Sequence, residues 1–244
     1  MKETGLIFSQ PMVIATNEGL KHVTRRLRGL EHLNENPDSW AVCRPLDWLE
    51  NLKGGGVQEF PGRTGASWIA LKDNLGITDG GYYVFSCPFG EVGDRIWVRE
   101  TWSEEKDVHG IGTIHSYFYK AGSEMRDADT LQVLDDFGVA YDRLKWKPSI
   151  HMPRVACRTI LELVSIELER LHEITEESAE SEGVYWYGSP SPGINSFRNY
   201  LVPESEDIGV LSATYSFETL WCSLHSVDSW LHNPWVWVLK FKKV

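Results

Sequence analysis

Gly93-Asp94-Arg95-Ile96-Trp97-Val98-Arg99-Glu100 is the stretch that decides the fold. After the Gly-Asp pair, apolar and charged side chains alternate, and a period of two is typical of a β-strand with one buried face. Cys87-Pro88-Phe89-Gly90 lies just before it and favours a turn, because glycine and proline adopt the backbone angles that turns need. The stretch therefore predicts a turn followed by a half-buried strand.

Further strands are predicted on both sides of this one. They cover His22–Arg28, His115–Ala121, Arg154–Leu171 as one long or two consecutive strands, and Pro234–Lys242. In the first of them, alternation places Thr24, Arg26 and Arg28 on one face. A helix continuing through that segment is the weaker alternative.

Short helices are predicted between the strands. They cover Gln10–Glu18, Glu176–Glu182 and a segment from a Ser216 cap to Leu224. Pro11 suits a first helical position and Thr175 suits an N-cap. Gly19 and Gly183 suit the left-handed residue that follows a helix end.

Two segments rich in Gly, Pro and Ser are predicted as loop insertions, at about residues 34–81 and 185–207. Trp40, Trp48 and Trp68 lie in the first of them. Large apolar rings are costly to leave in water, so we expect these side chains to pack the insertion back onto the domain.

The order of elements predicts an α+β fold built on a mixed or antiparallel β-barrel, with short flanking helices and loop insertions. Strands do not alternate regularly with helices, which disfavours a Rossmann fold. The sequence has no G-x-G-x-x-G, Walker A, G-x-S-x-G or H-E-x-x-H motif. A length of 244 residues suits a single domain over residues 1–244.

Composition narrows the function classes. Hydrophobic residues make up 42% of the chain, which excludes disorder, and no apolar run reaches the roughly 18 residues that a membrane helix needs. Cys43, Cys87, Cys157 and Cys222 lie far apart without a C-x-x-C pair, so we expect neither a zinc site nor a disulfide framework. These observations predict a cytoplasmic protein without a membrane partner.

The distribution of charge confines any contact with nucleic acid to a small part of the surface. The net charge of −11 repels a polyanion, so nonspecific binding is disfavoured. Residues 20–30 and 142–158 are nevertheless rich in Lys and Arg and nearly free of acids. We interpret these segments either as solvated faces or as the walls of one basic cleft.

Gly19-x-Lys21-x-x-Thr24-x-Arg26 is the motif with a capacity for chemistry. A hydroxyl is a poor nucleophile unless a base takes its proton, and a lysine acts as that base only when its pKa is lowered. Arg25 and Arg26 supply neighbouring cations that lower it. The alternative is a solvated basic turn followed by an ordinary β-branched strand residue.

Four motifs together resemble the ASCH domain of the PUA-like superfamily. They are Gly19–Arg26, Gly93–Glu100, Thr175–Gly183 and a closing aromatic strand. Cys87–Gly90, Trp146–Arg154 and Asn233–Val238 resemble a longer ASCH-like group found in phages and prophages. The resemblance implies a small β-barrel with a cleft that receives a nucleobase.

The resemblance also implies an activity. Small bacterial members of the family include amidohydrolases that act on N4-acetylcytidine with a Lys, a Thr and a Glu, which fall here on Lys21, Thr24 and Glu182. Thr24 would attack the amide carbonyl, Lys21 would accept its proton, and Glu182 would orient Lys21 or shuttle the proton. Arg26 would stabilise the oxyanion, and no metal or cofactor is implied.

Two other functions stay open. The first is a noncatalytic reader of RNA or modified nucleic acid, in which Arg25, Arg26 and Arg28 contact phosphates beside Lys21. Arg99 is a further candidate for binding. The second is a phage structural or assembly accessory protein, in which the tryptophan-rich insertions form an interface.

Overall fold

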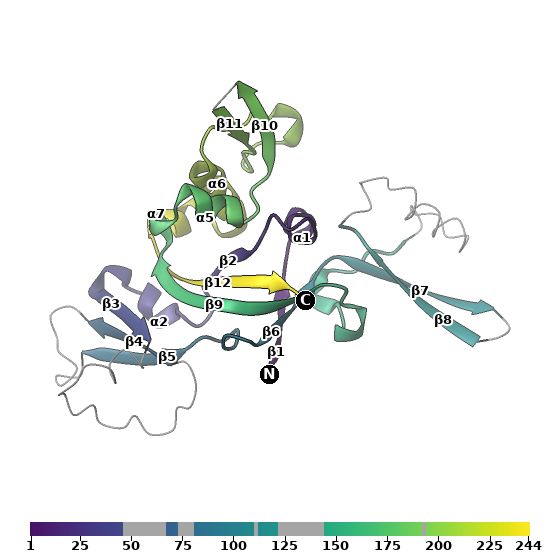
Figure 1. Ribbon diagram of the computed structural model, residues 1–244, viewed down its shortest axis with the longest axis horizontal. Coiled ribbons are helices and arrows are strands. Elements are labelled where there is room, and N and C mark those ends of the chain that lie inside the picture. The colour runs from purple at the N-terminus through teal and green to yellow at the C-terminus, as the bar shows by residue number, and fades with distance from the viewer. Residues whose placement is uncertain (46–66, 73–80, 110–111, 122–143, 192–193) are drawn as a thin grey trace.

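A curled five-stranded sheet forms the centre of the molecule (Figure 1). The structure is a computed structural model, and it describes residues 1–45, 67–72, 81–109, 112–121, 144–191 and 194–244. The strand order is β1-β6-β9-β12-β2, and only β1 and β6 are parallel neighbours. The strands are β1 Glu3–Ile7, β2 Val23–Arg26, β6 Arg95–Arg99, β9 Ile160–Arg170 and β12 Trp235–Lys243.

The two edge strands of this sheet approach each other. β1 and β2 stand at opposite ends of the strand order, yet Nη2 of Arg26 in β2 donates to the carbonyl oxygen of Ile7 in β1 at 3.1 Å. No backbone ladder joins the two edges, and the described residues form no closed barrel. The coarse α+β class is therefore present, as a mixed structure with several sheets and few helices.

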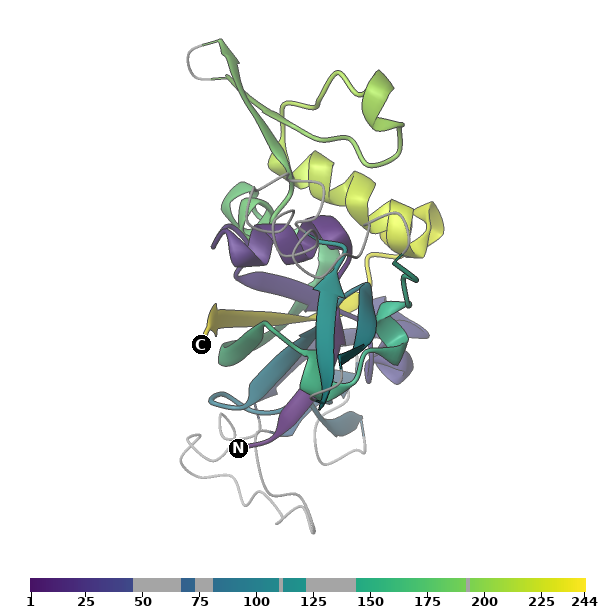
Figure 2. The same cartoon turned by 90° about the vertical axis from the view of Figure 1, so that its right-hand side faces the viewer.

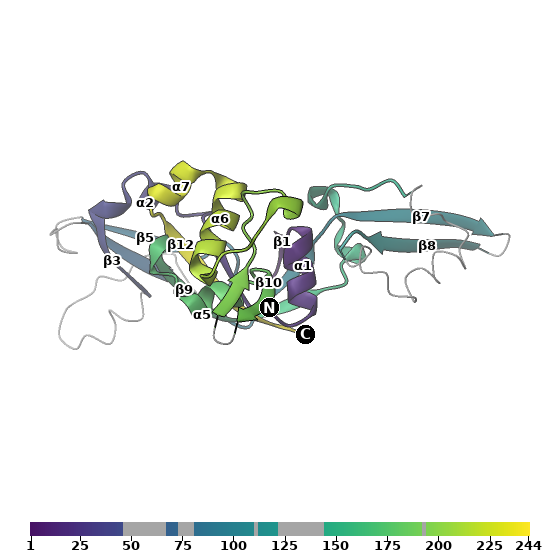
Figure 3. The same ribbon diagram turned by 90° about the horizontal axis from the view of Figure 1, so that it is seen from above.

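Three smaller sheets surround the centre. One contains β3 Trp40–Pro45, β4 Ser67–Lys72 and β5 Tyr82–Ser86, and two are hairpins, β7 Trp102–His109 with β8 Gly112–Tyr119 and β10 Trp186–Ser191 with β11 Ile194–Phe197. The three-stranded sheet and the β7–β8 hairpin lie at opposite ends of the molecule in two views (Figures 1 and 3).

Several helices lie on one side of the central sheet (Figure 1). The α-helices are α1 Gln10–Asn17, α2 Glu31–Asn34, α5 Glu176–Ser181, α6 Ala213–His225 and α7 Val227–Leu231. The 3-10 helices are η1 Pro37–Ser39, η4 Ser149–His151, η5 Arg154–Ala156, η6 Leu171–Glu173 and η7 Glu204–Glu206. Figure 2 shows α1, α5 and α6 above the strands, with the β10–β11 hairpin beyond them. None of the helices in the described ranges is long and apolar enough to cross a membrane.

Capping residues define the helices next to the candidate site. The Thr175 hydroxyl accepts from the backbone N–H of Ser178 and begins α5, as predicted. Gly19 and Gly183 follow α1 and α5 with φ of +75° and +79°, which confirms both predicted stops. The predicted Ser216 cap is wrong, because Ser212 is the extended residue whose hydroxyl accepts a helical N–H, and α6 begins four residues earlier than expected.

Both predicted loop insertions contain strands where the structure describes them. β3 and β4 lie within residues 34–81, and β10 and β11 lie within residues 185–207. Trp40 and Trp68 are buried in the core as predicted, and Trp48 lies outside the described residues. The strand predicted from Arg154 begins only at Ile160, because the chain forms the 3-10 turn η5 after Pro153.

One buried apolar cluster links the central sheet with the three-stranded sheet and the helices. Trp237 of β12 is fully buried, and its ring centroid lies 5.6 Å from that of Trp68 in β4 and 5.7 Å from that of Phe85 in β5. These contacts hold β12, the neighbour of β2, against the three-stranded sheet.

Candidate functional site

Lys21 and Glu182 form a buried ion pair at the junction of α1, α5 and β2. Lys21 follows the end of α1, and Glu182 is the C-cap residue of α5, just before Gly183. The Lys21 Nζ donates to Oε2 of Glu182 at 2.7 Å, to the Glu182 carbonyl oxygen at 2.6 Å and to the Val23 carbonyl oxygen at 2.8 Å. Each side chain belongs to a residue only 3% exposed. Three acceptors match the three hydrogens of an ammonium, so these contacts stabilise the charged form of Lys21.

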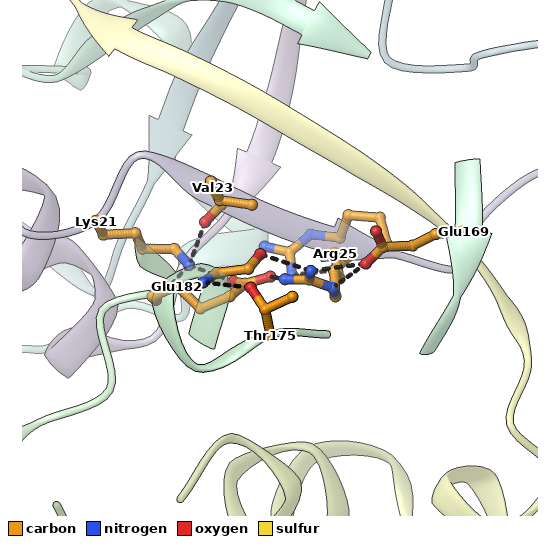
Figure 4. A network of polar contacts seen from close by, with 8 residues as sticks. Lys21, Val23, Arg25, Glu169, Thr175 and Glu182 are labelled. Atoms are coloured by element: carbon orange, nitrogen blue, oxygen red, sulfur yellow. Dashed lines mark hydrogen bonds and ion pairs between the residues drawn. The ribbon is translucent and has the colours of Figure 1, made fainter. Parts of the chain in front are cut away.

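Arg25 occupies the other carboxylate oxygen of Glu182 (Figure 4). Its Nη1 donates to Glu182 Oε1 at 3.1 Å, and its Nη2 donates to the Ser178 hydroxyl at 2.7 Å. Its Nε and Nη2 also donate to Oε1 of Glu169, at 2.9 and 2.6 Å. A chain of contacts therefore runs from Glu169 through Arg25 and Glu182 to Lys21.

The sheet register explains why Arg25 and Glu169 meet. Arg25 pairs with Val238 of β12, and Glu169 of β9 pairs with Val236 of the same strand. Both valines are buried and share the face that Arg25 and Glu169 occupy, since side chains two apart point to the same side. The long polar side chains reach each other across the short side chains of β12.

Thr24 and Arg26 lie on the opposite face of β2. Their register partners on β12 are Leu239 and Trp237, which are both fully buried. Thr24 is 1% exposed, and its side chain makes no hydrogen bond within the described part of the chain. The Lys21 Nζ contacts the carbonyl of Val23, so the ammonium lies against the peptide unit that joins Val23 to Thr24.

Arg26 and Lys21 share one aromatic ring. The Arg26 guanidinium carbon and the Lys21 Nζ each lie 5.6 Å from the centroid of Phe8, in the segment between β1 and α1. Arg26 donates to the carbonyl oxygens of Arg25 and Ile7 and forms no ion pair with a described carboxylate. Among the described cations of this site, Lys21 and Arg25 each pair with a carboxylate and Arg26 does not.

The site holds more positive than negative charge. Lys21, Arg25 and Arg26 face Glu169 and Glu182, and three cations less two anions leave one positive charge. Burial lowers the pKa of Lys21 to about 8, although the carboxylate of Glu182 opposes this effect. Burial also raises the pKa of Glu169, against the attraction of Arg25. A lysine with a pKa of about 8 is partly neutral near physiological pH.

The remaining predicted binding residues lie elsewhere. Arg28 is exposed after the end of β2. Arg99 of β6 donates to the Ile150 carbonyl oxygen and stacks on Trp97, with 5.2 Å between its guanidinium carbon and the ring centroid. Arg25 lies in the interior instead of at the surface where a phosphate contact was expected.

Three cations of the second basic segment form ion pairs away from this site. Three of its residues are paired with acids: Lys147 with Glu104, Arg154 with Glu3, and Arg158 with Glu100. Arg143 lies outside the described residues. These three described cations of residues 142–158 are thus engaged in local ion pairs, and the cleft between the two basic segments stays a prediction.

Three contributors were missed in the sequence: Glu169, Ser178 and Phe8. The sequence does carry a signal for Glu169, because Glu167 and Glu169 alternate with Ile166 and Leu168. That alternation is the signal that places both acids on one face of a strand.

No metal centre is evident in the part of the chain that the structure describes, where no three His, Cys, Asp or Glu side chains gather. Comparison with family models, curated proteins and solved structures found no match to this sequence. The function of this chain is therefore inferred from the residues of the site.

Proposed function

We propose that this protein is an ASCH-type amidohydrolase that removes an acyl group from N4-acylated cytidine. The observation that supports it is the buried Lys21, which Glu182 holds beside the backbone of Thr24. The curled sheet, whose edge strands β1 and β2 approach each other, supports a PUA-like barrel as the fold. The cytoplasmic location expected from the sequence belongs to the same proposal.

Thr24 is the nucleophile. Neutral Lys21 accepts the hydroxyl proton while Thr24 Oγ1 bonds to the acyl carbon, and the C–N bond of the tetrahedral intermediate then breaks. The leaving N4 amine takes the proton from the Lys21 ammonium. Lys21 then takes a proton from water, whose oxygen attacks the threonyl ester, and Lys21 returns that proton to Thr24 Oγ1 as the C–O bond breaks and the carboxylic acid is released.

The surplus positive charge suits this reaction. The carbonyl oxygen of the substrate gains negative charge in the transition state, and a fixed cation nearby stabilises it. Arg26 has no carboxylate partner among the described residues and shares a face with Thr24. Because Thr24 and Lys21 are almost fully buried, substrate reaches them only when the residues packed over β2 move.

The test is hydrolysis of N4-acetylcytidine, followed by mass spectrometry of the nucleoside. Thr24→Val removes the hydroxyl while keeping the branched shape, so turnover is expected to fall at least ~1000-fold, to about the uncatalysed level. Thr159→Val is the matched control, because Thr159 is an equally buried threonine that bonds to Asn17. Equal turnover in wild type and Thr24→Val would contradict the proposal.

A noncatalytic nucleic-acid reader is the second candidate. The low exposure of Lys21 and Thr24, and the full hydrogen bonding of the Lys21 ammonium, favour it. A reader hydrolyses no acylcytidine but binds RNA through the exposed Arg28 and through Arg26. Loss of each phosphate contact should flatten the slope of log affinity against log salt by about 0.7 to 0.9.

A further inference from the structure

We propose that Arg25 and Glu169 are positioning residues for Lys21. They fix the Glu182 carboxylate, and their charges shift the pH at which Lys21 releases its proton. The inference rests on the proposed function only for the use made of that proton, because the contacts exist whatever the substrate is.

Arg25 prevents the Glu182 carboxylate from rotating. The two oxygens of that carboxylate have different partners, Oε1 the Arg25 guanidinium and Oε2 the Lys21 ammonium. The Arg25 side chain is 1% exposed and packs 5.6 Å from the ring centroid of Phe217 in α6. A carboxylate held at both oxygens presents a single geometry to the lysine, which is what a base positioned for catalysis requires.

Glu169 is the end of the network nearest to solvent. Its side chain is 22% exposed, against 4% for Glu182. Only one of its oxygens, Oε1, bonds to the guanidinium, and it receives two donors. Glu169 therefore fixes the position of Arg25 and offsets part of its charge.

Charged groups face this network from several elements. They are Arg25 and Arg26 of β2, Glu182 after α5, Glu167 and Glu169 of β9, Lys240 of β12 bonded to Glu167, Glu173 of η6 near Glu169, and His225 of α6 near Arg26. Removing a negative charge from such a set disfavours the Lys21 ammonium, and removing a positive charge favours it.

Two neutral substitutions should therefore shift the titration of Lys21 in opposite directions. Glu169→Gln is expected to lower its pKa by about 0.5 to 1 unit, and Arg25→Gln to raise it by a similar amount. The pKa is measured by NMR on protein labelled at the lysine side chains, with the Lys21 signal assigned by its absence from Lys21→Met. Glu162→Gln is the matched control, because Glu162 lies on the same strand and pairs with Lys242 instead.

The kinetic readout is the pH profile of hydrolysis. The pH of half-maximal hydrolysis, which reports the titration of Lys21, is expected to shift in each variant by as much as the pKa measured by NMR. If Arg25 and Glu169 had a purely structural role, the variants would lose stability and this pH would not change. Glu169→Gln keeps the side-chain volume and an acceptor oxygen, so it decides the question even if Arg25→Gln does not fold. Arg25→Lys retains the charge and should leave the Lys21 pKa closer to wild type than Arg25→Gln does.

A Lys21 titration that Glu169→Gln leaves unchanged or raises would overturn the inference. So would a shift in the same direction in both neutral variants. The NMR measurement needs no turnover, so opposite shifts in a protein that hydrolyses no acylcytidine would support the positioning pair while refuting the proposed function.

Discussion

Lys21 makes the protein less stable at neutral pH than it would be without a buried charge. Its pKa is about 8 in the folded chain, against 10.5 as the ordinary value. Between these values the unfolded chain binds the proton more tightly, so the free energy of unfolding rises with pH across the window. Below about pH 8 the full cost is present, and it amounts to about 3 kcal/mol.

The rise of the free energy of unfolding with pH gives a prediction for Lys21→Met. Between about pH 7 and 10 the wild type should gain up to about 3 kcal/mol of stability relative to the variant, because only the wild type loses a buried charge in that range. Urea denaturation of both proteins at the two pH values measures it. Other lysines and tyrosines titrate in both proteins and cancel, so a constant difference between them would contradict the prediction.

At the scale of elements, two glycines that end helices differ in how closely they pack against the site. Gly19 and Gly183 both have a positive φ, but a Cβ at Gly19 would meet nothing within 4 Å, whereas one at Gly183 would lie 2.9 Å from the Cβ atoms of Ala15 and Lys21. The turn after α5 is therefore packed directly against the turn after α1.

Alanine at each position should distinguish these effects. Gly19→Ala is expected to cost about 1 kcal/mol from the left-handed backbone alone. Gly183→Ala should cost about 1 to 3 kcal/mol more and reduce hydrolysis sharply, because the new methyl group displaces Lys21. Urea denaturation and the nucleoside assay measure the two effects, and equal losses in both variants would count against the packed turn.

Elements with local signals were predictable, and those that depend on distant partners were not. The caps and stops of α1 and α5 are read from neighbouring residues such as Thr175 and Gly183. The strands β3, β4, β10 and β11 were not predicted, because Gly and Pro in the same segments favour loops. Pairing partners far away in the chain, which single-sequence patterns do not specify, decide such strands.

In the candidate site, too, residues with a local motif were predictable and residues with distant partners were not. The motif around Lys21 and Thr24, together with the family resemblance, led to Glu182, and the structure places that carboxylate on Lys21. Arg25 was assigned to the surface, because its partner Glu169 lies 144 residues further along the chain. The period of two separates Arg25 from Thr24 and Arg26, but only the three-dimensional register identifies the acid that meets it.

At the scale of the whole molecule, Trp237 connects two sheets. Trp237→Ala removes the ring that packs on Trp68 and Phe85, and we expect a loss of about 3 to 5 kcal/mol. Because the ring belongs to one cluster that spans both sheets, unfolding should remain a single transition. Coincident urea curves from circular dichroism and tryptophan fluorescence test this, and separate transitions would indicate two domains.

The approach of β1 to β2 has a consequence for behaviour at high concentration. An open sheet exposes unpaired N–H and C=O groups along both outer strands, which can recruit a strand from another chain and begin aggregation. Here one such carbonyl, that of Ile7, already accepts from Arg26, and β2 is only four residues long. The same arginine that stands beside the proposed nucleophile thus helps to keep neighbouring copies from joining edge to edge.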